Sequence, residues 1–166
     1  MRLSELLGVD GFLLGLPFGD KRSALKAITA NLAVRRGQSE GAILNALLRR
    51  ERLGSTATGD GVAVPHALLE GISEPAAVLA TLQHSISFDA PDGRNVDLLL
   101  GLLWPCDSRE GFFFALAQSI RLLHQSSCRE CLYNATSSAE AHAGIEALEK
   151  MSGGSLHYVP SMGRKA

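Results

Sequence analysis

The chain has 166 residues, of which 46% are hydrophobic and 20% charged, and its formal net charge is −1. This size predicts one domain with a full core, and the near-zero charge gives no electrostatic case for nucleic-acid binding. The longest apolar runs, at residues 96–104 and 112–117, are too short to span a bilayer. Acidic Glu5 and Asp10 interrupt any signal-peptide core, so we expect a cytoplasmic protein without membrane insertion.

The first half of the chain reads as mostly helical. Its predicted elements are a short helix over 3–8, a short strand over 12–16, and two longer helices over 21–34 and 39–51. Asp20 is a suitable N-cap for the first of the longer helices. Gly37 and Gly54 follow the ends of these two helices, where glycine commonly stops a helix.

The second half of the chain is expected to supply most of the sheet. Its predicted elements are strands over 62–64, 77–82 and 96–104, then helices over 109–124, 128–134 and 139–150. A long connection with a Pro-Asp-Gly turn is expected over 83–95. The apolar run at 96–104 is typical of a central strand buried on both faces. Together these elements predict a single α/β domain over residues 1–150, with a central mixed β-sheet flanked by helices on both faces, and a C-terminal tail over 151–166.

The stretch GSTATGDGVAVPH, at residues 54–66, is the most informative part of the chain. A loop rich in glycine and hydroxyl groups leads into a short apolar strand, and Pro65 fixes the backbone next to His66. An imidazole on rigid backbone beside N–H and hydroxyl donors is suited to carrying or passing a charged group. On these residues alone, a turn followed by a structural histidine is the alternative.

Three cysteines, Cys106, Cys128 and Cys131, include one C-x-x-C pair. This pair would suit redox or zinc chemistry in a strand-to-helix setting or beside a second pair of ligands. Its flanks instead show a helix-like apolar pattern with no such second pair. We therefore interpret Cys128 and Cys131 as ordinary helix cysteines and predict no metal and no cofactor.

Two separated motifs resemble the fructose/mannitol-type enzyme IIA of the bacterial phosphotransferase system. The first is RRERLGSTATGDGVAVPHA at residues 49–67, and the second is SISFDAPDGRNVDLLLGLLWP at residues 85–105. They stand in the order typical of that family, and the similarity extends over about residues 3–150. A short domain without fused transporter segments most resembles the nitrogen-regulatory enzyme IIA.

The resemblance implies a phosphohistidine protein, that is, a phosphotransferase component. His66 would accept a phosphoryl group from an HPr-type phosphocarrier protein and act in a regulatory relay with target proteins. Arg50 would clamp phosphate oxygens, Ser55 and Thr56 would donate hydroxyl hydrogen bonds, and the amides of residues 59–61 would form part of an anion nest. Without the resemblance, Arg50 reads as a solvated charge at a helix end and the two hydroxyls as turn-forming groups.

The chain departs from the family pattern at two positions. The family often has a second histidine early in the helix after the core strand, and Phe112 is the best match to that position. Leu68 stands close to where a basic residue commonly follows the Pro-His pair. Loss of both groups should change the pKa and orientation of His66. The other histidines, which read as surface or structural residues, are His84, His124, His142 and His157.

Three consecutive phenylalanines at residues 112–114 cannot all face inward on a helix. We expect two of them to pack in the core and one to be exposed at a docking surface. Because the chain departs from the family pattern at Phe112 and Leu68, the alternative function is a regulatory protein-binding module on the same fold, with weak or lost phosphotransfer.

Overall fold

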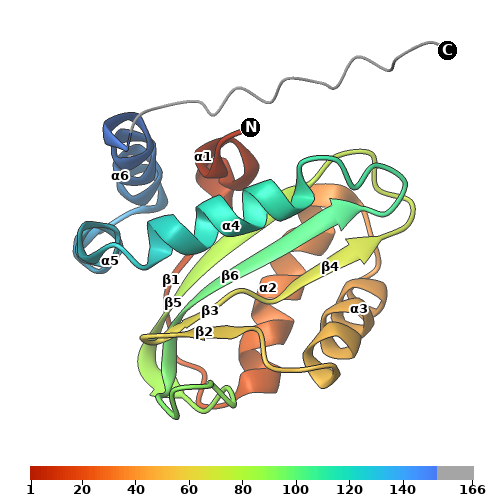
Figure 1. Ribbon diagram of the computed structural model, residues 1–166, viewed down its shortest axis with the longest axis horizontal. Coiled ribbons are helices and arrows are strands. Elements are labelled where there is room, and N and C mark those ends of the chain that lie inside the picture. The colour runs from red at the N-terminus through yellow and green to blue at the C-terminus, as the bar shows by residue number, and fades with distance from the viewer. Residues whose placement is uncertain (153–166) are drawn as a thin grey trace, which may run out of the picture.

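A mixed β-sheet forms the centre of the computed structural model, which describes residues 1–152 (Figure 1). Its six strands in the described residues are β1 (Phe12–Leu16), β2 (Ala57–Gly59), β3 (Val62–Ala63), β4 (His66–Leu69), β5 (Ala76–Ile86) and β6 (Val96–Pro105). Their order in space is β1-β5-β6-β3-β2, and β4 pairs with β6 beyond the end of β3. Strands β5 and β6 are antiparallel, whereas β1 is parallel to β5, and β3 and β4 are parallel to β6.

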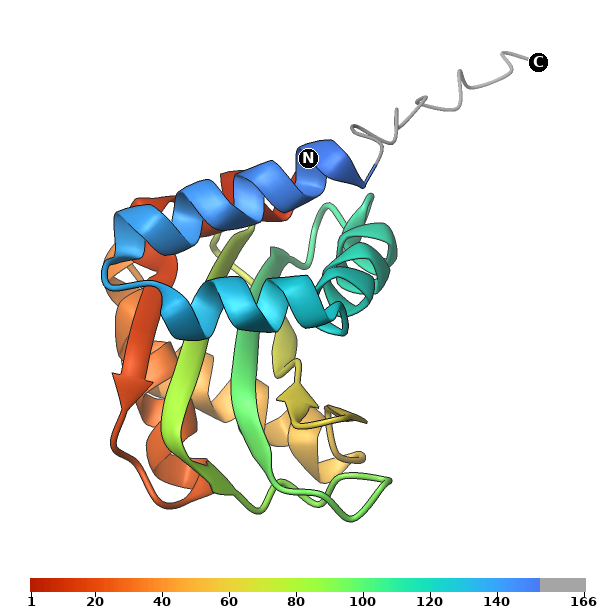
Figure 2. The same ribbon diagram turned by 90° about the vertical axis from the view of Figure 1, so that its left-hand side faces the viewer.

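Helices cover both faces of this sheet (Figure 2). They are α1 (Leu3–Leu7), the short 3-10 helix η1 (Val9–Gly11), α2 (Lys21–Arg36), α3 (Glu40–Arg52), α4 (Phe112–Leu123), α5 (Ser126–Asn134) and α6 (Ser138–Met151). Helices α2 and α3 pack on one face, and α1, α4, α5 and α6 pack on the other. The predicted α/β fold, with a central mixed sheet flanked on both faces, is confirmed.

Strand β6 is buried on both faces, which explains its nearly continuous apolar sequence. Leu99 belongs to the core under α2 and α3, whereas its neighbour Leu100 belongs to the core on the opposite face. Gly101 lies where α2 approaches the strand, and a Cβ atom there would collide with Cγ2 of Ile28. The close approach of helix and strand therefore requires glycine at this position.

Local capping groups set the ends of the two helices on the α2–α3 face. The Asp20 carboxylate accepts a hydrogen bond from the backbone N–H of Ser23 at 2.9 Å, so the predicted N-cap is confirmed. Gly37 ends α2 in the left-handed conformation, with φ of +61°. The Ser39 side chain then caps α3. These signals place the last turn of α3, which carries Arg50, beside strand β4.

Three strands differ from the sequence-based expectations. Strand β5 continues to Ile86, which pairs with Val96, so the predicted connection begins later than expected and His84 lies in a strand. Strand β2 lies in the predicted glycine loop and pairs with β3. Strand β4 begins at His66 and pairs with the end of β6. These segments are strands because a neighbouring strand pairs with them. Their own residue pattern does not predict a strand.

The C-x-x-C pair lies on α5, as predicted. Cys128 is fully buried, and burial raises the pKa of its thiol to about 12. Cys131 packs tightly on α6, since a Cβ atom at Gly144 would collide with its sulfur. The thiol of Cys128 is thus held protonated at neutral pH, and both cysteines pack at the α5–α6 contact.

No helix within residues 1–152 has the length and apolar character needed to cross a membrane. The predicted C-terminal tail, including His157, lies outside the described residues apart from its first two positions. The predicted domain boundary at residue 150 therefore stays a prediction.

Candidate functional site

His66 is the first residue of β4, and its ring is held in one orientation by the backbone before it. Its Nδ1 lies 2.8 Å from the carbonyl oxygen of Val64. A carbonyl can only accept a hydrogen bond, so Nδ1 carries the proton and Nε2 carries the lone pair. The N–H at Nε of Arg50 donates to this Nε2 at 3.0 Å. The nucleophilic nitrogen of His66 therefore faces a guanidinium cation.

Burial lowers the pKa of His66 below its ordinary value of 6.5, and the positive charge of Arg50 lowers it further. The carbonyl of Val64 and the carboxylate of Glu51 act in the opposite direction without reversing the shift. The imidazole is therefore mainly neutral at pH 7, which is the state in which Nε2 can attack an electrophile.

Arg50 is held in place by the end of its own helix. Its Nη1 donates to the carbonyl oxygen of Gly54 at 3.0 Å, while its Nε reaches His66. No acceptor within residues 1–152 forms a hydrogen bond with Nη2. The structure thus brings Arg50 and His66 together and leaves part of a guanidinium fork available beside Nε2, the arrangement that suits binding of phosphate oxygens.

Ser55 and Thr56 lie in the turn after α3, but their hydroxyl protons point to protein acceptors. Ser55 Oγ donates to the carbonyl oxygen of Phe88, and Thr56 Oγ1 donates to the carboxylate of Glu51 at 2.6 Å. In this arrangement neither hydroxyl donates toward His66. Both residues hold the turn that follows Arg50, so a direct role for them as phosphate donors stays a prediction.

Glu51 is a buried carboxylate that was not predicted as part of the site. Its oxygens accept hydrogen bonds from Thr56, at the backbone N–H (3.1 Å) and the hydroxyl, and form an ion pair with Lys21 Nζ at 2.8 Å. The sequence contains a signal for its burial, because Glu51 continues the apolar stripe of Ile43 and Leu47 at intervals of one helical turn. Glu51 ties the turn after α3 to the start of α2.

The predicted anion nest at residues 59–61 is not near His66, and this expectation is wrong. Val62 pairs with Leu98 and His66 pairs with Leu102, so the two sites are separated by about 13 Å along β6 at the usual strand rise. The backbone N–H of Asp60 already donates to the Asp92 carboxylate at 2.8 Å. The glycine loop shapes the opposite end of the sheet.

Phe112, aligned with the position of the family's second histidine, lies directly against His66. The two ring centroids are 5.7 Å apart. Phe112 is only 5% exposed, whereas Phe113 is 75% and Phe114 is 42% exposed. The expectation that two of the three phenylalanines pack in the core is therefore wrong. Helix α4 begins after Gly111, with φ of +78°, and of the three phenylalanines only Phe112 belongs to the core.

The remaining described histidines contact other parts of the molecule. His84 lies in β5, and the side chain of His142 contacts the carbonyl oxygen of Ser4 at 3.1 Å. His124 contacts Thr58 Oγ1 at 2.9 Å. Leu68, close to where family members commonly have a basic residue, is partly buried and packs against the core that includes Phe112. Arg50 is thus the cation that the structure places beside His66.

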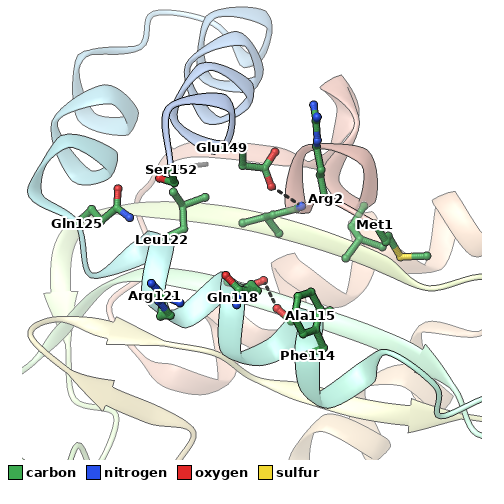
Figure 3. A pocket seen from close by; sticks show the side chains of 13 residues that line it. Met1, Arg2, Phe114, Ala115, Gln118, Arg121, Leu122, Gln125, Glu149 and Ser152 are labelled. Carbon is green, nitrogen blue, oxygen red and sulfur yellow. Dashed lines mark hydrogen bonds between the residues drawn. The ribbon is translucent and has the colours of Figure 1, made fainter. Parts of the chain in front are cut away.

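A separate hollow of about 280 Å³ lies between α1, α4 and α6 (Figure 3). Phe114, Gln118 and Arg121 line it from α4. Glu149 lines it from α6 and accepts a hydrogen bond from the backbone N–H of Leu3 at 2.6 Å. Its lining residues include neither His66 nor Arg50, so the hollow is distinct from the site on β4.

Comparison with known proteins identifies the family of the chain. The model of the family described as "Phosphoenolpyruvate-dependent sugar phosphotransferase system, EIIA 2" matches residues 5–147. The chain belongs to this family, as its two sequence motifs indicate.

Several similar proteins are nitrogen regulatory proteins. One from Bradyrhizobium diazoefficiens is 35% identical over 148 residues, which are 89% of this chain and 96% of the relative. Another from Pseudomonas aeruginosa is 36% identical and covers 81% of this chain and 88% of its own. The crystal structure of the nitrogen regulatory protein IIA-Ntr from Neisseria meningitidis matches with a TM-score of 0.80 at 29% identity, covering 86% of this chain and 97% of that one. The resemblance to the nitrogen-regulatory type is confirmed.

Proposed function

We propose that the protein is a phosphohistidine protein of a regulatory phosphotransferase relay, in which Nε2 of His66 accepts a phosphoryl group from an HPr-type carrier. The observation that carries this proposal is the pair of contacts at the imidazole. Nδ1 is occupied by the carbonyl of Val64, and Nε2 faces Arg50 at 3.0 Å. This arrangement supplies a nucleophile of defined tautomer next to a cation that can receive phosphate oxygens.

The transfer step needs no proton acceptor at His66. The lone pair of Nε2 forms a bond to phosphorus while the bond between phosphorus and the donor histidine breaks, and that electron pair returns to the donor nitrogen. During the transfer Nδ1 keeps its proton against the carbonyl of Val64, and the phosphorylated ring is afterwards in protonation equilibrium at this nitrogen. The Nε–H of Arg50, which donates to Nε2 in the unphosphorylated protein, then donates to a phosphoryl oxygen instead.

Phosphorylation would also change the surface that partners encounter. It adds a charge of about −2 at half-buried His66, whose ring contacts Phe112, and Phe112 in turn contacts the exposed Phe113. Such a change can create or abolish a protein interface. The names of the relatives support a regulatory role, in which the phosphorylated and free forms bind different target proteins.

A protein-binding module with weak or lost phosphotransfer is the second candidate. Two observations favour it, namely an apolar ring at the position of the family's second imidazole and the exposure of Phe113 and Phe114. In this function the exposed rings would contact the partner whether or not His66 carries phosphate.

The test is incubation of the full chain with phosphoenolpyruvate and the general phosphotransferase proteins, followed by intact mass spectrometry. We expect the mass of one phosphoryl group, lost on acid treatment and absent when the HPr-type carrier is omitted. An established enzyme IIA in a parallel reaction shows that the carrier is active. If that control is phosphorylated and this chain is not, the relay function is contradicted and the binding module is favoured.

A further inference from the structure

We propose that Phe112 is a positioning residue that shields phosphorylated His66 from water, so that the phosphorylated form persists until a partner receives it. This inference rests on the proposed function and concerns the lifetime of its product. The resting geometry that supports it is a direct contact between the two rings, whose centroids are 5.7 Å apart and whose planes are inclined by 52°.

The Phe112 ring is fixed in this position by its surroundings. Its centroid lies 5.9 Å from that of Trp104 and 5.2 Å from that of Phe113. The indole N–H of Trp104 donates to the carbonyl oxygen of Ser108 at 2.8 Å, which holds the indole in turn. Because Phe112 is only 5% exposed, it cannot swing out to solvent without opening this aromatic cluster.

The imidazole of His66 therefore has two chemically different neighbours. Arg50 contacts the reacting nitrogen with a charged donor. Phe112 contacts the ring with a surface that can neither donate nor accept a proton. Such a neighbour supplies no acid, no base and no hydrogen bond for a water molecule, so its contribution is to exclude water and to disfavour charge on the imidazole.

Both contributions slow hydrolysis of a phosphohistidine. In hydrolysis a water oxygen forms a bond to phosphorus, the bond from phosphorus to Nε2 breaks, its electron pair returns to Nε2, and the water protons remain on inorganic phosphate or pass to solvent. The imidazole leaves more readily when its ring carries a positive charge. An apolar ring at this contact disfavours that charged form and leaves less room for the attacking water.

The experiment compares three substitutions at Phe112 with one at an exposed phenylalanine on the same helix. Phe112→Gln and Phe112→His place polar groups beside His66, whereas Phe112→Leu keeps an apolar side chain. Phe114→Gln is the matched control, because Phe114 is exposed on the same helix and lines the hollow that is distinct from the site on β4. Circular dichroism verifies that each variant folds. If Phe112→Gln does not fold, the same measurements are made on Phe112→His, which keeps a planar ring.

The first measurement is an NMR pH titration of the His66 ring in the unphosphorylated protein. Burial lowers the pKa of His66 in the wild type. The polar substitutions at Phe112 are expected to raise the midpoint toward the ordinary value of 6.5, while Phe112→Leu and Phe114→Gln leave it near the wild-type value. An unchanged midpoint in both polar variants contradicts the inference.

The second measurement is the half-life of the phosphorylated protein after removal of carrier and phosphoenolpyruvate. We expect the half-life to fall by about 3- to 10-fold in the polar Phe112 variants, because a ring pKa raised by about half to one unit increases the protonated fraction of the phosphorylated ring by that factor. The half-life should be kept in Phe112→Leu and Phe114→Gln. Phosphate uptake by the wild type is measured first. No uptake overturns both the proposed function and this inference, whereas uptake with equal half-lives in all variants overturns this inference alone.

Discussion

His66→Gln is expected to abolish phosphorylation of the protein by the HPr-type carrier. Glutamine keeps a polar side chain at the start of β4 beside Arg50, but its amide nitrogen has no available lone pair with which to attack phosphorus. The measurement is intact mass after incubation with the general phosphotransferase proteins, and the expected result is no detectable gain of phosphate.

The matched control is His84→Gln, which replaces an exposed histidine on β5. This variant is expected to take up one phosphate at the wild-type rate, because His84 makes no hydrogen bond with any described residue of the site on β4. Retention of phosphate in His66→Gln, with a normal unfolding transition, would mean that another residue is the acceptor.

Arg50→Ala is expected to slow phosphorylation by about 10²-fold. A hydrogen bond to a charged group contributes about 1.5–3 kcal/mol, and each 1.4 kcal/mol, roughly, changes a rate tenfold. Removal of Arg50 also removes a positive charge that lowers the pKa of His66. Rates are therefore compared at pH 8, above the ordinary histidine pKa of about 6.5, where His66 is neutral in both proteins.

Two further variants test whether the phosphorylation rate depends on the position of Arg50 or only on its positive charge. Arg49→Ala removes an exposed arginine from the same helical turn and should leave the rate unchanged. Arg50→Lys keeps the charge but lacks the guanidinium fork that reaches both His66 and Gly54, so an intermediate rate is expected. Equal rates in Arg50→Ala and wild type would show that Arg50 does not act on the phosphoryl group.

Features of the fold that depend on local chemistry were predictable from the sequence. The apolar run of β6 requires burial on both faces, and Asp20 and Gly37 mark a helix start and end through hydrogen bonding and backbone conformation in their own turns. Strands β2 and β4 were not predictable in this way. The residues of β4 become a strand because the end of β6 offers them unpaired backbone groups.

In the candidate site, too, the sequence predicts some features and not others. The motif identified His66 and Arg50, but their contact depends on α3 ending beside β4, which no local pattern specifies. The motif also identified Ser55 and Thr56 as hydroxyl donors. Their acceptors, the carbonyl of Phe88 and the buried carboxylate of Glu51, are set by tertiary packing. The local sequence pattern thus predicted which chemical groups are present in the site, but it did not predict which residues they bind.

The most direct test of the account is to identify which nitrogen carries the phosphate. The protein is phosphorylated through the HPr-type carrier with ¹⁵N-labelled histidine and studied by ¹⁵N and ³¹P NMR. Because Nδ1 of His66 is held by the carbonyl of Val64 and Nε2 faces Arg50, the account predicts phosphorus coupled to Nε2 of His66. Phosphorus on Nδ1 of His66, or on any other histidine, would contradict it.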